Sequence, residues 1–362
     1  PGPGPPPAAR PSPNFPSHTL YYPHMSSPLG KRNVIVTGGA GFIGTFLCER
    51  LLKEDCRVLC IDNFSTSHQE NIAHLLKNHD FEFIRHDINT PIELEQDPEM
   101  QLFNLRLQGI QEIYHLACPR TGRRFDQFQL QTLLTNSVGL HNVLEIAVKW
   151  KSKFFLASSA VVYGPRPEDG HLLKEGEYGT FGHLEPNSCY DQGKQWAETM
   201  VDTYRQVHGI DVRIGRVFRT FVPRMPLDAG HLIPDFIRAA MDGQPIEVYG
   251  KDLRSSFLYV TDCVDAIIRF MQLIKDPGPM NIGSDYDLKI SDVAKQIIDL
   301  TGSTSTMTVA DPPYYMAQHG LPDLTKVREE LGWMPIMTFA QGLKRTIEYT
   351  IANRGIVHPT GE

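Results

Sequence analysis

Residues 33–44 of this chain read NVIVTGGAGFIG, and this stretch decides the fold. A β-branched run at 33–37 ends in glycines and is followed by apolar residues at helical spacing, which predicts a strand, a tight turn and a helix. In that context Gly38, Gly41 and Gly44 would serve the turn, the approach of the backbone to a pyrophosphate, and helix-to-strand packing. The helix N-terminus would present free N–H groups to the phosphates. The stretch therefore predicts a dinucleotide-binding turn.

Further strand-like runs follow this turn at regular intervals. They lie at 57–61, 81–84, 112–117 and 153–158, and a helical pattern covers 133–148. Strands that alternate with helices in this way predict an α/β fold with a Rossmann-type, doubly wound parallel sheet. Residues 93–109 show no clear period, so we expect a surface insertion there.

The predicted domain organisation has three parts. Residues 1–30 hold eight prolines in the first sixteen positions, which predicts a disordered, Pro-rich tail. Residues 31–220 would form the NAD-binding domain that also carries the catalytic residues. Prolines divide shorter elements beyond this point, so residues 221–355 predict a smaller α+β lobe for the substrate, with the chain crossing between the lobes. Its candidate helices are 290–300 and 339–351.

The composition excludes several classes of function. The net charge is −7 without a sustained basic stretch, so no nucleic-acid partner is expected. The six cysteines include no C-x-x-C and no pairing with histidine at ligand spacing. We therefore expect no metal site and free thiols in a reducing compartment. No apolar run approaches the roughly 20 residues that span a bilayer. We expect a cytoplasmic protein without membrane contact in this fragment, while an anchor upstream of Pro1 stays open.

A carboxylate follows the second predicted strand. Asp62 lies 18 residues after Gly44, directly after the run at 57–61. A carboxylate in this position accepts hydrogen bonds from the adenosine ribose, and its charge repels a 2′-phosphate. The sequence therefore predicts NAD rather than NADP as the cofactor.

Tyr190 and Lys194 lie four residues apart in a segment with a helical pattern, 189–206, so both side chains share one face. A phenol is a poor base at neutral pH, but a nearby ammonium and a positive nicotinamide would stabilise the phenolate. Tyr190 would then take the proton of a sugar hydroxyl as hydride leaves. Alone, such a pair is more typical of a solvated surface. Ser159, at the end of the strand predicted at 153–158, favours the catalytic interpretation, because open α/β sheets present catalytic groups there.

These residues resemble a known family, the extended short-chain dehydrogenase/reductases that act on nucleotide-diphosphate sugars, and within it the UDP-glucuronate decarboxylases. The likeness runs from about residue 31 to residue 349. Its most specific segments are YHLACP at 114–119 and SCYDQGK at 188–194. Other matching segments are VTGGAGFIG at 36–44, IDNF at 61–64, RHD at 85–87, PRM at 223–225 and LGWMP at 331–335.

The resemblance implies a reaction cycle on bound NAD. Tyr190 would deprotonate the C4 hydroxyl of UDP-glucuronate while hydride passes to NAD, which gives a 4-keto sugar acid. The carboxylate is then β to a ketone and would leave as carbon dioxide, because the ketone accepts the electrons as an enolate. Hydride would return to give UDP-xylose, so no net cofactor would be consumed.

The resemblance also implies which residues form the site. The catalytic set would be Ser159, Tyr190 and Lys194. Cofactor contacts would come from Gly38, Gly41, Phe42, Ile43, Gly44, Asp62, Asn63, Asp87, Ile88, Leu116, Ala117, Tyr190 and Lys194. Contacts to the UDP-sugar substrate would come from Pro119, Arg219, Arg224, His231, Tyr249 and Arg254. Enzymes of this kind commonly dimerise through helices in the region of 130–150, so a homodimer is expected by analogy.

The sequence departs from the family pattern at several positions. Val161 stands where the family has a catalytic glutamate, and Ser255 stands where it has an arginine, with Arg254 immediately beside it. Further departures are Arg219, Val222 and His231. Three interpretations therefore stay open. They are decarboxylation of UDP-glucuronate, 4-epimerisation or related 4-keto chemistry of a nucleotide sugar, and a catalytically silent NAD-binding protein that acts as a partner.

Overall fold

The described part of the chain covers most of the sequence. A computed structural model describes residues 30–353 apart from 97–99, 101–102, 120–121, 181, 228–229, 251 and 314–317. The predicted tail, except for Gly30, lies outside the described residues, as do the last two residues of the predicted lobe at 221–355.

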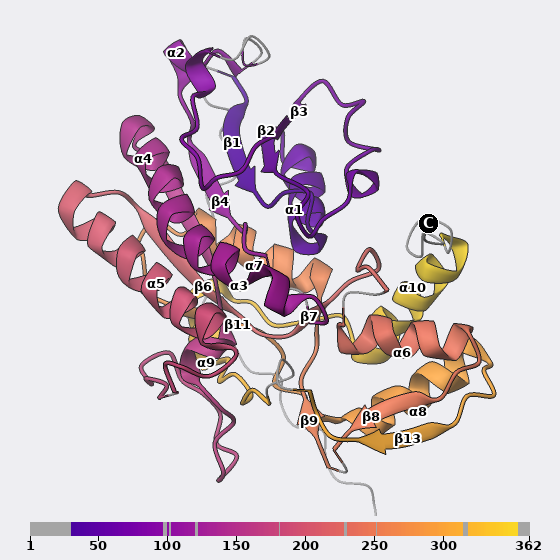
Figure 1. Cartoon of the computed structure of the whole chain (residues 1–362). Helices are drawn as coiled ribbons and strands as arrows, with labels where there is room; N and C mark the ends of the chain where they lie inside the picture. The colour runs from indigo at the N-terminus through magenta and orange to yellow at the C-terminus, as the bar shows by residue number, and fades with distance from the viewer. Residues whose placement is uncertain are drawn as a thin grey trace, which may run out of the picture.

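Within the described residues, a sheet of seven parallel strands forms the centre of the fold (Figure 1). Its strands are β1 (Arg32–Thr37), β2 (Cys56–Asp62), β3 (Phe81–Arg85), β4 (Glu112–His115), β5 (Lys153–Ser159), β6 (Val212–Val217) and β11 (Met280–Ile282). Their order is β11-β6-β5-β4-β1-β2-β3. The chain order reverses between β1 and β4, and such a switch point opens a crevice at the carboxyl ends of the strands. The predicted Rossmann-type, doubly wound sheet is confirmed.

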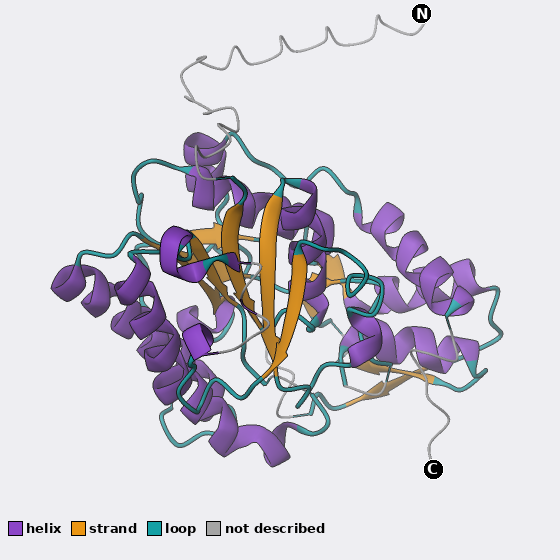
Figure 2. Cartoon of the chain, turned by 90° about the horizontal axis from the view of Figure 1, so that it is seen from above, coloured by secondary structure: helices purple, strands orange, loops and turns teal. Residues whose placement is uncertain are grey.

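Helices cover both faces of the sheet, as Figure 2 shows from above. One face is covered by α1 (Phe42–Lys53) and α7 (Val260–Gln272), and the other by α4 (Leu140–Trp150) and α5 (Ser188–His208). Helix α4 shows why, because Leu140, Val143, Leu144 and Ala147 are buried at helical spacing, and this apolar stripe packs into the cluster that it shares with β4, β5 and α5. The two faces therefore hold separate apolar clusters.

The helical pattern expected at 133–148 is divided in the structure. Helix α3 (Phe125–Leu134) leads into one π-helical stretch (Thr135–Gly139), and α4 follows directly. The expected surface insertion at 93–109 is wrong as a description of its side chains. Leu94, Met100 and Phe103 are buried in the apolar cluster under α4, and a short helix, α2 (Leu105–Gln108), follows. Leu94 lies in a 3-10 helix of three residues, Leu94–Gln96, and such short helical turns are too brief to show a period in the sequence.

The C-terminal part of the chain forms a second group of elements and also returns to the main sheet. Its helices are α6 (Leu232–Met241), α8 (Ile290–Thr301), α9 (Thr325–Leu331) and α10 (Phe339–Ala352). Its strand pairs are β8 (Ile246–Tyr249) with β13 (Met307–Ala310), β9 (Arg254–Ser255) with β12 (Leu288–Lys289), and β7 (Thr220–Phe221) with β10 (Leu258–Tyr259). In Figure 1, α6, α8, β8 and β13 lie to one side of the sheet. Strand β11, by contrast, pairs with β6 at the edge of the main sheet, and α7 covers one face of that sheet.

The described helices include none with the length and apolar character needed to cross a membrane.

Candidate active site

The glycine turn follows β1 and opens helix α1. Gly38 has a φ of +71°, and a Cβ there would come within 2.7 Å of the backbone nitrogen of Ala117. A Cβ on Gly44 would come within 2.2 Å of the carbonyl oxygen of Gly38. Both positions therefore require glycine. Gly41 precedes the first turn of α1 and has no side chain to cap it, so the N–H groups of that turn can be donated to a phosphate.

Asp62 ends β2, and three donors hold its carboxylate. Oδ2 accepts a hydrogen bond from the backbone N–H of Ala40 at 3.1 Å. Oδ1 accepts from the backbone N–H of Phe64 at 2.9 Å and from the hydroxyl of Ser67 at 2.7 Å. These bonds place a carboxylate with little exposure beside the glycine turn. The Asp62 carboxylate can accept hydrogen bonds from ribose hydroxyls, and its charge repels a second negative group such as a 2′-phosphate.

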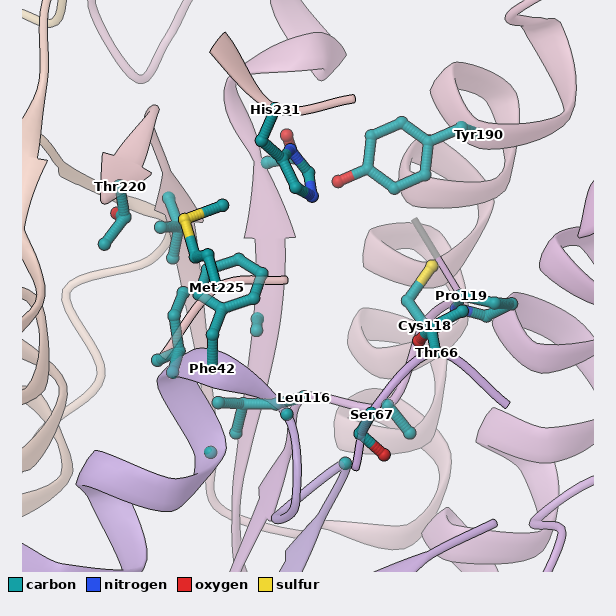
Figure 3. Close-up of a pocket in the computed structure, with 18 of the residues that line it drawn as sticks. Phe42, Thr66, Ser67, Leu116, Cys118, Pro119, Tyr190, Thr220, Met225 and His231 are labelled. Carbon is teal, nitrogen blue, oxygen red and sulfur yellow. The ribbon is translucent and has the colours of Figure 1, made fainter. Parts of the chain in front are cut away.

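A pocket at the carboxyl ends of the central strands brings most of the predicted residues together (Figure 3). All predicted cofactor residues line it, from the glycine turn, Asp62 and Asn63 to Asp87, Ile88, Leu116 and Ala117. It is also lined by Ser159, Tyr190 and Lys194, and by the predicted substrate residues Pro119, Arg219, Arg224 and His231. The residues predicted to bind the cofactor and the residues predicted to be catalytic therefore line one continuous pocket.

Tyr190 and Lys194 lie on the first two turns of α5. The ammonium of Lys194 is buried and donates to the carbonyl oxygen of Ala157 at 2.9 Å, and it lies 6.0 Å from the centre of the Tyr190 ring. Figure 3 shows the phenol oxygen of Tyr190 directed into the pocket, towards the ring of His231. Ser159 is the last residue of β5, and its hydroxyl accepts from the N–H of Val161 at 3.4 Å. The tyrosine and lysine are thus not a solvated surface pair.

His115 lies beneath this site as a neutral histidine. Its Nδ1 is 2.9 Å from the hydroxyl of Thr37, and its ring stacks on Phe154 with the centroids 6.0 Å apart. Burial, and then the charge of Lys194, lower the pKa of His115 to about 3. Lys194 is therefore not accompanied by a second positive charge from this ring at neutral pH.

Two pocket residues of the predicted substrate set are held by α1. The guanidinium of Arg224 pairs with the carboxylate of Glu49 and lies 4.7 Å from the centre of the Phe46 ring. His231 precedes α6 and packs edge-on against Phe42, with the ring centroids 6.0 Å apart. The N-terminal and C-terminal parts of the chain therefore meet across the pocket.

Tyr249 and Arg254 are not among the described residues that line the pocket. Nε of Arg254 donates to Oδ2 of Asp287 at 2.6 Å, and the carbonyl oxygen of Asp287 accepts from Nη2 at 3.0 Å. Ser255, its neighbour, is buried. Asp287 therefore holds the guanidinium of Arg254 away from the described residues that line the pocket, and a contact from Arg254 to the substrate stays a prediction.

Val161, at the position of the family glutamate, is buried and lines the pocket. It is the second residue of the 3-10 helix Ala160–Tyr163, which follows β5. The side chain at this point of the pocket wall, next to Ser159, is therefore apolar.

Several residues that line the pocket were not predicted from the sequence. They include Ser67, Asn71, His86, Cys118, Thr220, Met225, Phe257 and His319. Cys118 and Met225 lie inside matching segments and could have been found there. Ser67, Phe257 and His319 carry no such signal, because loops and distant strands bring them to the site.

Comparisons with known proteins agree with this geometry. A family model described as GDP-mannose 4,6 dehydratase matches residues 35–346. UDP-glucuronic acid decarboxylase 1 of Arabidopsis thaliana is 36% identical over 319 residues, which are 87% of this chain and 68% of that protein. UDP-glucuronic acid decarboxylase 1 of Xenopus tropicalis is 33% identical over 336 residues, 92% of this chain and 76% of that protein.

A solved structure shares the fold. It is a UDP-glucuronic acid 4-epimerase from Bacillus cereus in complex with a UDP-4-deoxy-4-fluoro-glucuronic acid and NAD. Its TM-score is 0.76 at 25% identity, and the match covers 88% of this chain and 99% of that one. This chain therefore belongs to the GDP-mannose 4,6 dehydratase family and, as its motifs predict, to the extended short-chain dehydrogenase/reductases that act on nucleotide sugars.

Proposed function

We propose that this chain is an NAD-dependent enzyme that converts UDP-glucuronate to UDP-xylose through a 4-keto intermediate. The observation that carries the proposal is the meeting of Ser159, Tyr190 and Lys194 in the pocket that also holds the glycine turn and Asp62. Relatives named UDP-glucuronic acid decarboxylase, at 33–36% identity over most of the chain, support this choice of reaction.

The residues present fit NAD. The turn at Gly38 and Gly44 leaves no space for a Cβ but leaves backbone N–H groups at the start of α1, as a pyrophosphate requires. Asp62 would hold the adenosine ribose, and its charge favours NAD over NADP. When bound, NAD supplies a hydride acceptor and donor at the reacting sugar carbon.

The chain's own residues would perform the proton transfers. Tyr190 would accept the proton of the C4 hydroxyl, and the hydroxyl of Ser159 would hydrogen-bond to the same oxygen. The Lys194 ammonium would favour the phenolate by its charge. The resulting β-keto acid loses carbon dioxide without a further base, because its own ketone accepts the electron pair. The enolate would then take a proton from water at C5, and Tyr190 would return its proton to the C4 oxygen as hydride returns to C4.

The UDP part of the substrate needs cations or donors at the other side of the pocket. Arg219, Arg224 and His231 line it there; Arg224 and His231 lie beyond the boundary predicted at residue 220, and Arg219 lies just before it. We propose that residues 221–355 supply this substrate side of the site. The guanidinium of Arg224 would have to be shared between Glu49 and a phosphate.

Val161 favours a second candidate function, which is 4-epimerisation of a nucleotide sugar. Epimerisation requires oxidation and reduction at C4 but no acid–base group at C5, so an apolar wall at Val161 is compatible with it. The UDP-glucuronic acid 4-epimerase of similar fold supports the same alternative.

One incubation distinguishes these candidates. The purified protein is examined by mass spectrometry for bound NAD and then incubated with UDP-glucuronate. We expect carbon dioxide and a UDP-pentose. A product that keeps all six sugar carbons in its NMR spectrum would replace decarboxylation by epimerisation. An NAD-loaded protein that converts no nucleotide sugar would leave the catalytically silent alternative.

We also propose a homodimer. Leu130, Leu133 and Leu134 on α3, and Val138 in the π-helical stretch, are exposed, and a second copy of this chain would cover them. Light scattering after gel filtration should give twice the monomer mass. The Leu130→Glu variant should shift the protein towards monomer, and a monomeric wild-type protein would contradict the proposal.

A further inference from the structure

We propose that Glu198 is a positioning residue for this active site, and the proposal rests on the proposed function. Glu198 is not among the described residues that line the pocket. It would act by holding the end of β5, which carries Ser159, against α5, which carries Tyr190 and Lys194. No part of the predicted mechanism uses it.

The Glu198 carboxylate has partners on two neighbouring strands. Oε1 accepts a hydrogen bond from the hydroxyl of Ser158 and another from Nε of Arg216 at 3.0 Å. Oε2 accepts from Nη2 of Arg216 at 2.8 Å. The side chains of Glu198 and Arg216 are only 13% and 8% exposed. This is a two-point ion pair with little solvent around it, which makes its geometry specific.

Two successive turns of α5 make side-chain hydrogen bonds to β5. Lys194 donates to the carbonyl oxygen of Ala157, and Glu198, one turn later on α5, accepts from the hydroxyl of Ser158. Two successive turns of α5 are thus bonded to two successive residues of β5. Ser159 is the next residue along the strand. Any shift of the helix against the strand must therefore change the relation of Ser159 to the tyrosine.

The register of the sheet brings in the third element. Ser158 on β5 lies directly opposite Arg216 on β6. The guanidinium of Arg216 also donates to the carbonyl oxygen of Glu175 at 3.0 Å and lies 4.7 Å from the centre of the Tyr163 ring. Tyr163 ends the 3-10 helix that follows Ser159. The pair therefore supports both the strand end and the turn that forms the pocket wall.

A role in positioning explains a buried ion pair better than a role in stability. Moving two charges out of water costs free energy that their attraction only partly returns. Catalytic groups, however, must be held to a fraction of an ångström by residues behind them, because small displacements lower the rate steeply.

Two variants of different severity test this role. Ser158→Ala removes only the hydroxyl bond and leaves the Glu198–Arg216 pair, whereas Glu198→Gln keeps the size of the side chain and removes its charge. We expect kcat for the nucleotide sugar to fall about 10- to 100-fold in Glu198→Gln, with KM changed less than about threefold. The double variant should lose less than the two single variants together, because Ser158 and Glu198 share one contact.

Glu112→Gln is the matched control. Glu112 is also buried, pairs with Arg32 and accepts from the hydroxyl of Tyr114 at 2.9 Å. It begins β4, at the opposite end of the strands from the pocket. We expect a comparable loss of Tm with unchanged kcat. If Glu198→Gln lowers kcat no more than this control, or if KM rises while kcat stays the same, the positioning role is overturned.

Failure of the proposed function can be recognised separately. A wild-type protein loaded with NAD that forms no new nucleotide sugar from UDP-glucuronate, followed by NMR, overturns the proposed function first. The crystal structure of Glu198→Gln then decides the positioning role. The hydrogen bond from Lys194 to Ala157 should be lengthened or lost, and a bond kept at its present length would contradict the proposal.

Discussion

The carboxylate of Asp62 accepts a hydrogen bond from the backbone N–H of Ala40 at 3.1 Å, and this bond joins the end of β2 to the turn after β1. The two segments are 22 residues apart in the sequence but meet because β1 and β2 are paired in parallel. An acid that discriminates between dinucleotides is thereby also part of the framework of the phosphate-binding turn. Its replacement should affect binding and folding together.

Asp62→Ala should weaken NAD binding about 10- to 100-fold, because hydrogen bonds to a charged group contribute about 1.5–3 kcal/mol. NADP binding should be weakened less, since the repulsion of its 2′-phosphate is removed. Calorimetric titration with both cofactors measures the ratio of the two Kd values. Ser67→Ala, which removes one donor to Asp62, should change that ratio much less. An unchanged ratio in Asp62→Ala would refute the assigned role.

Gly44→Ala should destabilise the protein by about 1–3 kcal/mol, as overpacking of a close contact does. The added Cβ would meet the carbonyl oxygen of Gly38 at 2.2 Å. NAD binding should be lost with it, because the turn must open. Gly176→Ala is the control, since a Cβ there has no neighbour within 4 Å. Urea unfolding should separate the two variants, and equal stability would contradict the close-packing role.

Tyr190→Phe should lower turnover about 100- to 10,000-fold, the range that one acid–base group contributes. The Tm and the amount of bound NAD should stay as in the wild type, because the ring and its packing remain. Thermal unfolding and a product assay by chromatography measure both effects. Retained turnover would exclude Tyr190 as the base.

His115 should make stability depend on pH. Burial lowers its pKa in the folded protein to about 3 from an ordinary 6.5, so the unfolded chain binds the proton more tightly. The stability that depends on a neutral His115 is fully present above pH 6.5. As the pH falls from 6.5 towards 3, the free energy of unfolding decreases by at most about 1.4 kcal/mol per pH unit. His115→Gln should show a shallower decline of the free energy of unfolding between these values. If the free energy of unfolding declines equally with pH in the wild type and the variant, His115 does not contribute to this pH dependence.

Most of the central sheet could be predicted because its signals are local. The run at 33–37 and the pattern at 153–158 each need only neighbouring residues, and both match observed strands to within a residue. The surface insertion expected at 93–109 was wrong because Phe103 is a buried apolar anchor in a short helical turn. Such an anchor has no period, so its burial depends on what folds over it.

By itself, the sequence determined the strand, glycine turn and helix at 33–44, the acid at the end of β2, and the shared helical face of Tyr190 and Lys194. These features depend on backbone sterics and on short spacing in the sequence, which are local properties that do not depend on tertiary packing. Only the tertiary structure decided which partner each charged side chain takes. Arg254 is held by Asp287, a residue 33 positions away, and Glu198 joins a helix to two strands. Such contacts depend on which elements are packed together, and the linear order of residues does not specify their distances.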